Sequence, residues 1–219
     1  MITIQIDFFT DKFYLYLAGY PECDNLLSVR IIAGSSKGKT LFSPPETTRP
    51  TSDRAREGLF SSLESEFGSI ADLNFLDLFS GSGAVGVEAL SRGAAQVISV
   101  EGHGPTSAVA EKNFGLVNNP QGKFAVINST AERYVGANHN IEFDIIFMDP
   151  PYDLTNSAIE SLIADIELHG LLKERGLIAI ERESKKTPFT WPAPFVQEKI
   201  RSYGQGSIFY GGRPASVLP

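Results

Sequence analysis

The chain has 219 residues and a formal net charge of −7, and its 42% hydrophobic and 21% charged residues exclude a disordered chain and fit one α/β core with a small appendage. The single cysteine, Cys23, excludes an intrachain disulfide, and no apolar run reaches the roughly 18 residues that cross a bilayer. The three histidines are too scattered for a metal site, so we expect no bound metal. We also expect a monomeric, cytoplasmic protein that does not bind a membrane.

Basic side chains gather in two segments of this acidic chain. Residues 28–58 carry six basic and three acidic side chains, and residues 182–213 carry six basic and two acidic side chains. Two interpretations remain open: these segments bind a polyanion locally, or they are ordinary solvated surface. Charge alone does not decide between them.

The first 50 residues contain no long periodic element. Met1–Tyr20 is rich in Ile, Phe, Tyr and Leu, but it has neither the basic leader nor the small-residue cleavage site of a secretory signal. Two short apolar runs flank a Gly/Ser/Lys turn in Arg30–Phe42, which predicts a small β-hairpin. Prolines at 44, 45 and 50 then favour an extended linker, because proline disfavours a helical residue before it.

The remainder of the chain predicts alternating strands and helices. A helix begins near Thr51 or Ser52, either of which can cap it. Strands are predicted at Leu73–Phe79, Gln96–Glu101, Lys123–Asn128, Phe143–Met148 and Leu177–Glu181, and helices near Ala84–Arg92, Pro105–Leu116 and Thr155–Leu168. Residues 197–210 read as a closing antiparallel hairpin. We therefore predict a seven-stranded, mostly parallel α/β sheet with helices on both faces and the last strand inserted antiparallel.

A glycine loop follows the first of these strands. Gly81, Gly83 and Gly86 form G-x-G-x-x-G between strand and helix, and Glu101 follows 20 residues after the first glycine, at the end of the next strand. Such glycines let backbone amides approach a nucleoside, whose ribose hydroxyls the acid can accept. The pattern fits a nicotinamide dinucleotide as well as S-adenosylmethionine. Asp77 favours the latter, because its carboxylate would balance the methionine ammonium and repel a pyrophosphate.

The sequence Asp149-Pro150-Pro151-Tyr152 ends the fourth predicted strand, where open α/β sheets place ligands. The Asp149 carboxylate and the Pro150 carbonyl can both accept hydrogen bonds from an exocyclic amine, while the two prolines stiffen the turn. Tyr152 can stack on a base turned out of its helix. Alternatively, these four residues are only a proline turn that ends the strand, with a packed tyrosine. The glycine loop and Glu101 favour the amine site over this purely structural interpretation.

Four segments together resemble one family. The chain resembles the bacterial 16S rRNA guanine(966)-N2 methyltransferases in four segments that follow in the same order. These are Arg30-Ile-Ile-Ala-Gly, Arg49-Pro-Thr-Ser-Asp-Arg-Ala-Arg-Glu57, the loop segment from Leu76 to Gly93, and Asp149–Tyr152. The resemblance runs from about Val29 to the C-terminus. It implies a Rossmann-like class I methyltransferase fold and methyl transfer from S-adenosylmethionine to the N2 amine of a guanine. The partner would be 16S rRNA or an assembly intermediate of the small ribosomal subunit.

The resemblance also implies a role for each matching residue. Asp149, Pro150, Pro151 and Tyr152 would form the amine site. The cofactor site would contain Asp77, Ser80, Gly81, Gly83, Glu101, Asn128 and Ala131. RNA would contact Arg30, Lys37, Lys39, Arg49, Arg54 and Arg56. Residues 29–50 would form the hairpin and linker, and residues 51–219 the methyltransferase domain.

Two departures from the family pattern stand out. Residues 1–28 have no counterpart, and we expect them not to belong to the working enzyme. The His103-Gly104-Pro105 turn differs from the more common charged turn. An adenine-N6 methyltransferase on DNA or RNA, which also uses Asp-Pro-Pro-Tyr, and a non-catalytic ribosome-assembly factor are the alternative functions.

Overall fold

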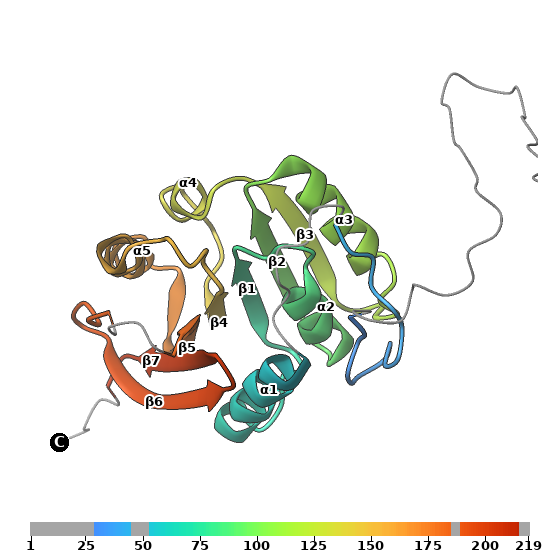
Figure 1. Cartoon of the computed structure of the whole chain (residues 1–219), viewed down its shortest axis with the longest axis horizontal. Coiled ribbons are helices and arrows are strands. Elements are labelled where there is room, and N and C mark those ends of the chain that lie inside the picture. The colour runs from blue at the N-terminus through green and yellow to red at the C-terminus, as the bar shows by residue number, and fades with distance from the viewer. Residues whose placement is uncertain (1–28, 45–52, 185–188, 215–219) are drawn as a thin grey trace, which may run out of the picture.

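The computed structural model describes residues 29–44, 53–184 and 189–214, which form one twisted sheet flanked by helices (Figure 1). The strands are β1 (Asn74–Leu78), β2 (Gln96–Glu101), β3 (Lys123–Asn128), β4 (Phe143–Met148), β5 (Leu172–Glu183), β6 (Val196–Tyr203) and β7 (Gly206–Gly212). Their order is β3-β2-β1-β4-β5-β7-β6, and β7 runs antiparallel between β5 and β6. The predicted seven-stranded, mostly parallel sheet is confirmed.

Within the described residues, five helices cover the two faces of the sheet: α1 (Asp53–Phe67), α2 (Ala84–Ser91), α3 (Gly104–Phe114), α4 (Ala131–Val135) and α5 (Asn156–Leu168). Apolar residues of α1, α2 and α3 pack in one core cluster, and those of α4 and α5 pack in a second. Successive strand residues alternate between these clusters: Phe75 belongs to the first and Leu76 to the second. None of the helices in the described ranges is long and apolar enough to span a bilayer.

Two elements differ from the sequence prediction. Strand β5 begins at Leu172, five residues before the predicted start, because Leu172 pairs with Phe143 and Lys173 forms an ion pair with Asp144 at 2.8 Å. The short helix α4 was not predicted. Its Thr130 cap accepts a hydrogen bond from the Arg133 N–H at 3.2 Å, and its length is too small for a periodic pattern.

The predicted N-terminal β-hairpin is not confirmed as a two-stranded ribbon. Within residues 29–44 a single antiparallel bridge joins Arg30 and Thr40. The segment is held instead by α2, where the buried Glu88 carboxylate accepts the N–H groups of Ile32 at 2.7 Å and Ala33 at 2.9 Å. The linker prolines 45 and 50, the predicted caps Thr51 and Ser52, and residues 1–28 lie outside the described residues.

Candidate active site

Three carboxylates converge at the carboxyl edge of the central strands. Asp77 is on β1, Glu101 ends β2, and Asp149 directly follows β4, which pairs with β1. The Asp149 nitrogen lies 3.5 Å from the Leu78 carbonyl oxygen, so the loop after β4 starts beside β1. Repulsion among these carboxylates favours either the protonation of one of them or a ligand that carries positive charge.

The carboxyl group of Asp77 is almost fully buried, at 1% exposure, under the start of α2. Its pKa is raised to about 8, chiefly by burial and to a smaller extent by the negative charges of Asp149 and Glu101. The Gly86 N–H, which donates to the carboxyl group at 2.9 Å, opposes the shift. Below about pH 8 Asp77 therefore keeps its proton when no cation lies near it, and a nearby cation would favour the ionised form.

The glycine loop bends toward β2 and is fixed there by Glu101. Gly81 has φ 54° and Gly83 has φ 77°, a left-handed conformation that favours glycine. The Gly81 N–H donates to Glu101 Oε2 at 2.9 Å, and the His103 N–H donates to Oε1 at 2.8 Å. The unusual turn after Glu101 thus orients this carboxylate, and Pro105 fits the first turn of α3, where no backbone donor is needed.

The remaining predicted cofactor residues lie around the same edge. The Asn128 side chain donates to the carbonyl oxygens of Glu101 at 2.8 Å and Gly102 at 3.1 Å, so it joins the ends of β2 and β3. Ala131 is buried at the start of α4. The buried hydroxyl oxygen of Ser80 makes no hydrogen bond within the described residues, which leaves it available to a polar ligand.

The loop Asp149–Tyr152 is held by an arginine that the sequence analysis missed. Arg182 of β5 is 4% exposed and donates to the carbonyl oxygens of Pro151 at 3.3 Å and Leu154 at 2.8 Å. Burial lowers the Arg182 pKa, and the charge of Asp149 opposes this effect. The signal was present: Arg182 continues the inward row of Ile178 and Ile180, where an unpaired cation would be costly.

The predicted RNA contacts fall into separate places. Arg54 is exposed on the first turn of α1, whereas Lys37 and Lys39 are exposed near the end of α3, where Lys39 donates to the Leu116 carbonyl oxygen at 2.6 Å. Because α3 runs from the carboxyl end of β2 back to the start of β3, these lysines lie toward the opposite edge from Asp149. Arg30 is exposed, and Arg49 lies outside the described residues.

Arg56 corrects the sequence prediction. Its side chain is 0% exposed and donates to the Arg30 carbonyl oxygen at 2.6 Å and to Asp53 Oδ1 at 2.8 Å. Burial lowers its pKa, against the opposing charges of Asp53 and Glu88. The prediction that Arg56 contacts RNA is therefore wrong for this structure, because the guanidinium fixes α1 to residues 29–44 instead.

No group of three or more His, Cys, Asp or Glu side chains within the described ranges is arranged to hold a metal ion. Two of the histidines, His103 and His139, make local contacts. His103 Nδ1 lies 2.8 Å from Thr106 Oγ1, and His139 Nε2 lies 2.6 Å from the Tyr134 carbonyl oxygen. Neither contact links a histidine to Asp149.

Comparison with known proteins matches residues 29–211 to the family model described as conserved hypothetical protein 95. The chain is 36% identical to the ribosomal RNA small subunit methyltransferase D of Escherichia coli over 81% of this chain and 86% of that protein. It is 33% identical to the putative rRNA methyltransferase YlbH of Bacillus subtilis, over 80% of this chain and 94% of that protein.

Solved structures agree with these sequence matches. A putative methyltransferase from Escherichia coli, yhhF, superposes with a TM-score of 0.73 at 33% identity, over 86% of this chain and 99% of that one. The putative methylase HI0767 from Haemophilus influenzae gives a TM-score of 0.67 at 31% identity, over 85% and 98%. The similarity therefore extends over nearly the whole of both solved chains.

Proposed function

The chain belongs to the family of small-subunit ribosomal RNA methyltransferases, and from this premise we propose that it methylates the N2 amine of guanine 966 in 16S rRNA with S-adenosylmethionine as the methyl donor. One observation carries the proposal: Asp149–Tyr152 follows β4 directly beside the strand that bears Asp77 and the glycine loop. The enzyme is proposed to act as a cytoplasmic monomer.

S-adenosylmethionine fits the donor set of this edge. When bound, it supplies a methyl group on a positively charged sulfur. Asp77 would hold the methionine ammonium, and the positive charge of the donor would relieve the repulsion among Asp77, Glu101 and Asp149. Each Glu101 oxygen accepts one backbone N–H and retains a lone pair for a ribose hydroxyl. Ser80, Asn128 and Ala131 would border the same ligand.

Asp149 and Pro150 would hold the target amine. The nitrogen lone pair of guanine N2 is delocalised into the ring, so the amine must be drawn toward tetrahedral geometry before it can react. The Asp149 carboxylate and the Pro150 carbonyl supply two hydrogen-bond acceptors for this purpose, and the rigid prolines fix their directions. The methylated amine then loses its extra proton to water, so no histidine base is required.

Tyr152 and Arg182 would support this arrangement from two sides. Tyr152 is 51% exposed, which leaves an aromatic face for a base turned out of the RNA. Arg182 holds the loop in place by donating hydrogen bonds to two of its carbonyl oxygens, and its buried charge also lies near Asp149. We propose that Arg182 is a positioning residue, since it acts on the amine only through the loop.

The proposed roles are tested by replacing Asp149 with alanine. Loss of one well-placed acceptor commonly lowers a rate by about 10²-fold or more, so we expect almost no methyl transfer to small-subunit RNA. Binding of S-adenosylmethionine, measured by calorimetry, should change little because Asp149 acts on the amine. Near-normal turnover would remove Asp149 from the mechanism.

The same chemistry would serve an adenine-N6 methyltransferase. The comparisons favour the guanine reaction, because the similar proteins are named for small-subunit ribosomal RNA. Nucleoside analysis of the methylated product separates the two, since N2-methylguanosine and N6-methyladenosine differ in retention and fragmentation. Detection of N6-methyladenosine would favour the alternative.

A further inference from the structure

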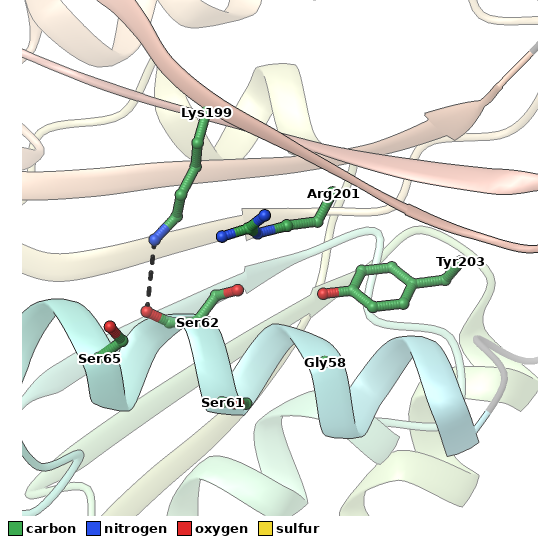
Figure 2. Close-up of a pocket in the computed structure, with 7 residues that line it drawn as sticks. All are labelled: Gly58, Ser61, Ser62, Ser65, Lys199, Arg201 and Tyr203. Atoms are coloured by element: carbon green, nitrogen blue, oxygen red, sulfur yellow. Dashed lines mark hydrogen bonds between the residues drawn. The ribbon is translucent and has the colours of Figure 1, made fainter.

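A pocket between α1 and β6 lies outside the site described above. Its volume is about 390 Å³, and its lining comes from small or hydroxyl-bearing residues of α1 and from three longer side chains of β6 (Figure 2): Gly58, Ser61, Ser62, Ser65, Lys199, Arg201 and Tyr203. We name these residues the α1–β6 groove. It combines two cations with several hydroxyl groups, so its chemistry is that of an anion site.

The spacing of the residues explains why they meet. Lys199, Arg201 and Tyr203 alternate along β6 and therefore point to one face of the sheet, toward α1 (Figure 2). The α1 residues recur at helical spacing and share one side of the helix. Gly58 permits the close approach, because a Cβ atom there would lie 2.2 Å from the Tyr203 ring.

The cations of the groove are only weakly neutralised. Arg201 is exposed and forms no ion pair with any residue in the described ranges. The Lys199 nitrogen lies 3.5 Å from the Ser62 carbonyl oxygen and 4.0 Å from Glu66 Oε2, the limit of an ion pair. The exposed Arg201 guanidinium lies beside the half-buried Lys199 ammonium. Together they make this surface attractive to anions, although the protein as a whole is acidic.

A buried hydroxyl points toward the same place. Tyr210 of β7 is 0% exposed, and its hydroxyl makes no hydrogen bond of good geometry. It interacts with Ser62, Tyr203 and Arg201, and Lys199 lies 4.9 Å above its ring. The groove is therefore backed on the sheet side by a buried polar group as well as by the residues that line it.

The groove reaches the edge of the sheet that carries Asp149–Tyr152. Strands β5 and β6 run in the same direction on either side of β7, and the register places Tyr203 and Glu183 opposite the same residue, Gly206. Arg182, which holds the Asp149 loop, is the neighbour of Glu183. Arg54, exposed four residues before Gly58, extends the basic surface along α1.

We propose that the α1–β6 groove binds the phosphate backbone of the substrate RNA at nucleotides next to the methylated guanine, an inference that rests on the proposed function. Arginine, lysine, serine and tyrosine are among the side chains that contact nucleic-acid phosphates, and such contacts fix position without reading sequence. The groove therefore supplies affinity and orientation, whereas Asp149–Tyr152 selects the amine.

The test compares Arg201→Ala with Arg175→Ala, which removes an exposed arginine from the start of β5, at the opposite edge of the sheet. Binding to small ribosomal subunits from cells that lack the gene, and to a transcript of the same RNA, is measured over a range of salt concentrations. Arg201→Ala should weaken RNA binding by about tenfold and reduce the salt slope by about one. Arg175→Ala should leave both unchanged.

Two further measurements make the result decisive. Calorimetry with S-adenosylmethionine should give the wild-type affinity for Arg201→Ala, and Arg201→Lys should retain most of the RNA affinity because it retains the charge. If Arg201→Ala binds RNA with wild-type affinity and salt slope while the wild-type enzyme methylates the subunits, the groove proposal is overturned and the proposed function stands. If the wild-type enzyme methylates neither RNA, the proposed function itself fails.

Discussion

At the scale of single residues, Asp77 makes the stability of the fold depend on pH. Its pKa in the folded chain is about 8, against an ordinary value of 3.8, chiefly because the carboxyl group is buried. Between these two values the folded chain binds more protons than the unfolded chain does. The free energy of unfolding must therefore fall as the pH rises through this window.

We predict that Asp77→Asn removes this pH dependence. The asparagine carbonyl can still accept the Gly86 N–H, but no charge is buried, so the melting temperature at about pH 8 should exceed that of the wild type. At about pH 5 the two proteins should melt at similar temperatures. Affinity for S-adenosylmethionine should fall, because the carboxylate that we propose to hold its ammonium is gone.

Thermal unfolding between these pH values, with exposed Asp72→Asn as the control, checks the prediction. A lower melting temperature of Asp77→Asn at about pH 8 would show that the buried carboxylate stabilises the fold. Unchanged affinity for the cofactor would argue against the assignment of Asp77 to the ammonium.

Arg182 is a residue whose shape should matter more than its charge. Its guanidinium reaches two carbonyl oxygens of the Asp149 loop at once, which a lysine ammonium on a flexible stem cannot reproduce. We predict that Arg182→Lys lowers kcat by about tenfold, because small misplacements of reacting groups are costly. The KM for S-adenosylmethionine should stay near the wild-type value.

Steady-state kinetics separates this positioning role from a merely structural one. A parallel rise in the KM of the cofactor, or a kcat equal to that of the wild type, would contradict it. A melting temperature close to the wild-type value ensures that the loss does not come from unfolding.

At the scale of elements, α2 holds residues 29–44 through one buried carboxylate. Glu88 accepts two backbone N–H groups and the Arg92 Nε, the latter at 2.8 Å. We predict that Glu88→Gln destabilises the fold by about 2 kcal/mol, since an amide offers one acceptor oxygen and leaves a buried donor unpaired.

Glu64→Gln is the matched control, because Glu64 pairs with the same arginine but is 43% exposed. The free energy of unfolding should change there by less than about 1 kcal/mol, as is usual for a surface ion pair. Denaturant unfolding of both variants measures the difference. Equal losses would contradict the claim that Glu88 anchors the segment.

The helices and strands also show how much of the fold could be predicted from local sequence patterns. The strands from β1 to β4 could be predicted because buried apolar runs and glycine turns lie next to each other in sequence. The first residues of β5 could not, because they extend the strand only through pairing with Phe143 and an ion pair with Asp144. The burial of Arg56 likewise depends on the Arg30 carbonyl, 26 residues away in sequence.

Part of the candidate site could likewise be predicted from the sequence, and part could not. Asp77, Glu101 and Asp149 could be predicted to meet, since all three belong to the carboxyl ends of parallel strands. The α1–β6 groove could not, because its residues come from α1 and β6 and meet only through the antiparallel end of the sheet. Arg182 stood out as a cation in an inward row, but its partners, the carbonyl oxygens of Pro151 and Leu154, are about 30 residues away in sequence.

At the scale of the whole molecule, an acidic chain must bring a polyanion to one edge of its sheet. The net charge of −7 opposes that approach, so local basic surfaces have to guide it. The α1–β6 groove and Arg54 lie toward the edge of Asp149, whereas Lys37 and Lys39 lie away from it. We infer that the RNA enters over α1 and β6 and places the guanine above β4.

The most direct test of this account is the position of the modified nucleotide in small-subunit RNA. RNA from cells with and without the gene is digested to mapped fragments and analysed by mass spectrometry. We predict that N2-methylguanosine at position 966 disappears without the gene, and that the wild-type gene, but not the Asp149→Ala gene, restores it. An unchanged modification at guanine 966, or the loss of N6-methyladenosine instead, would contradict the account.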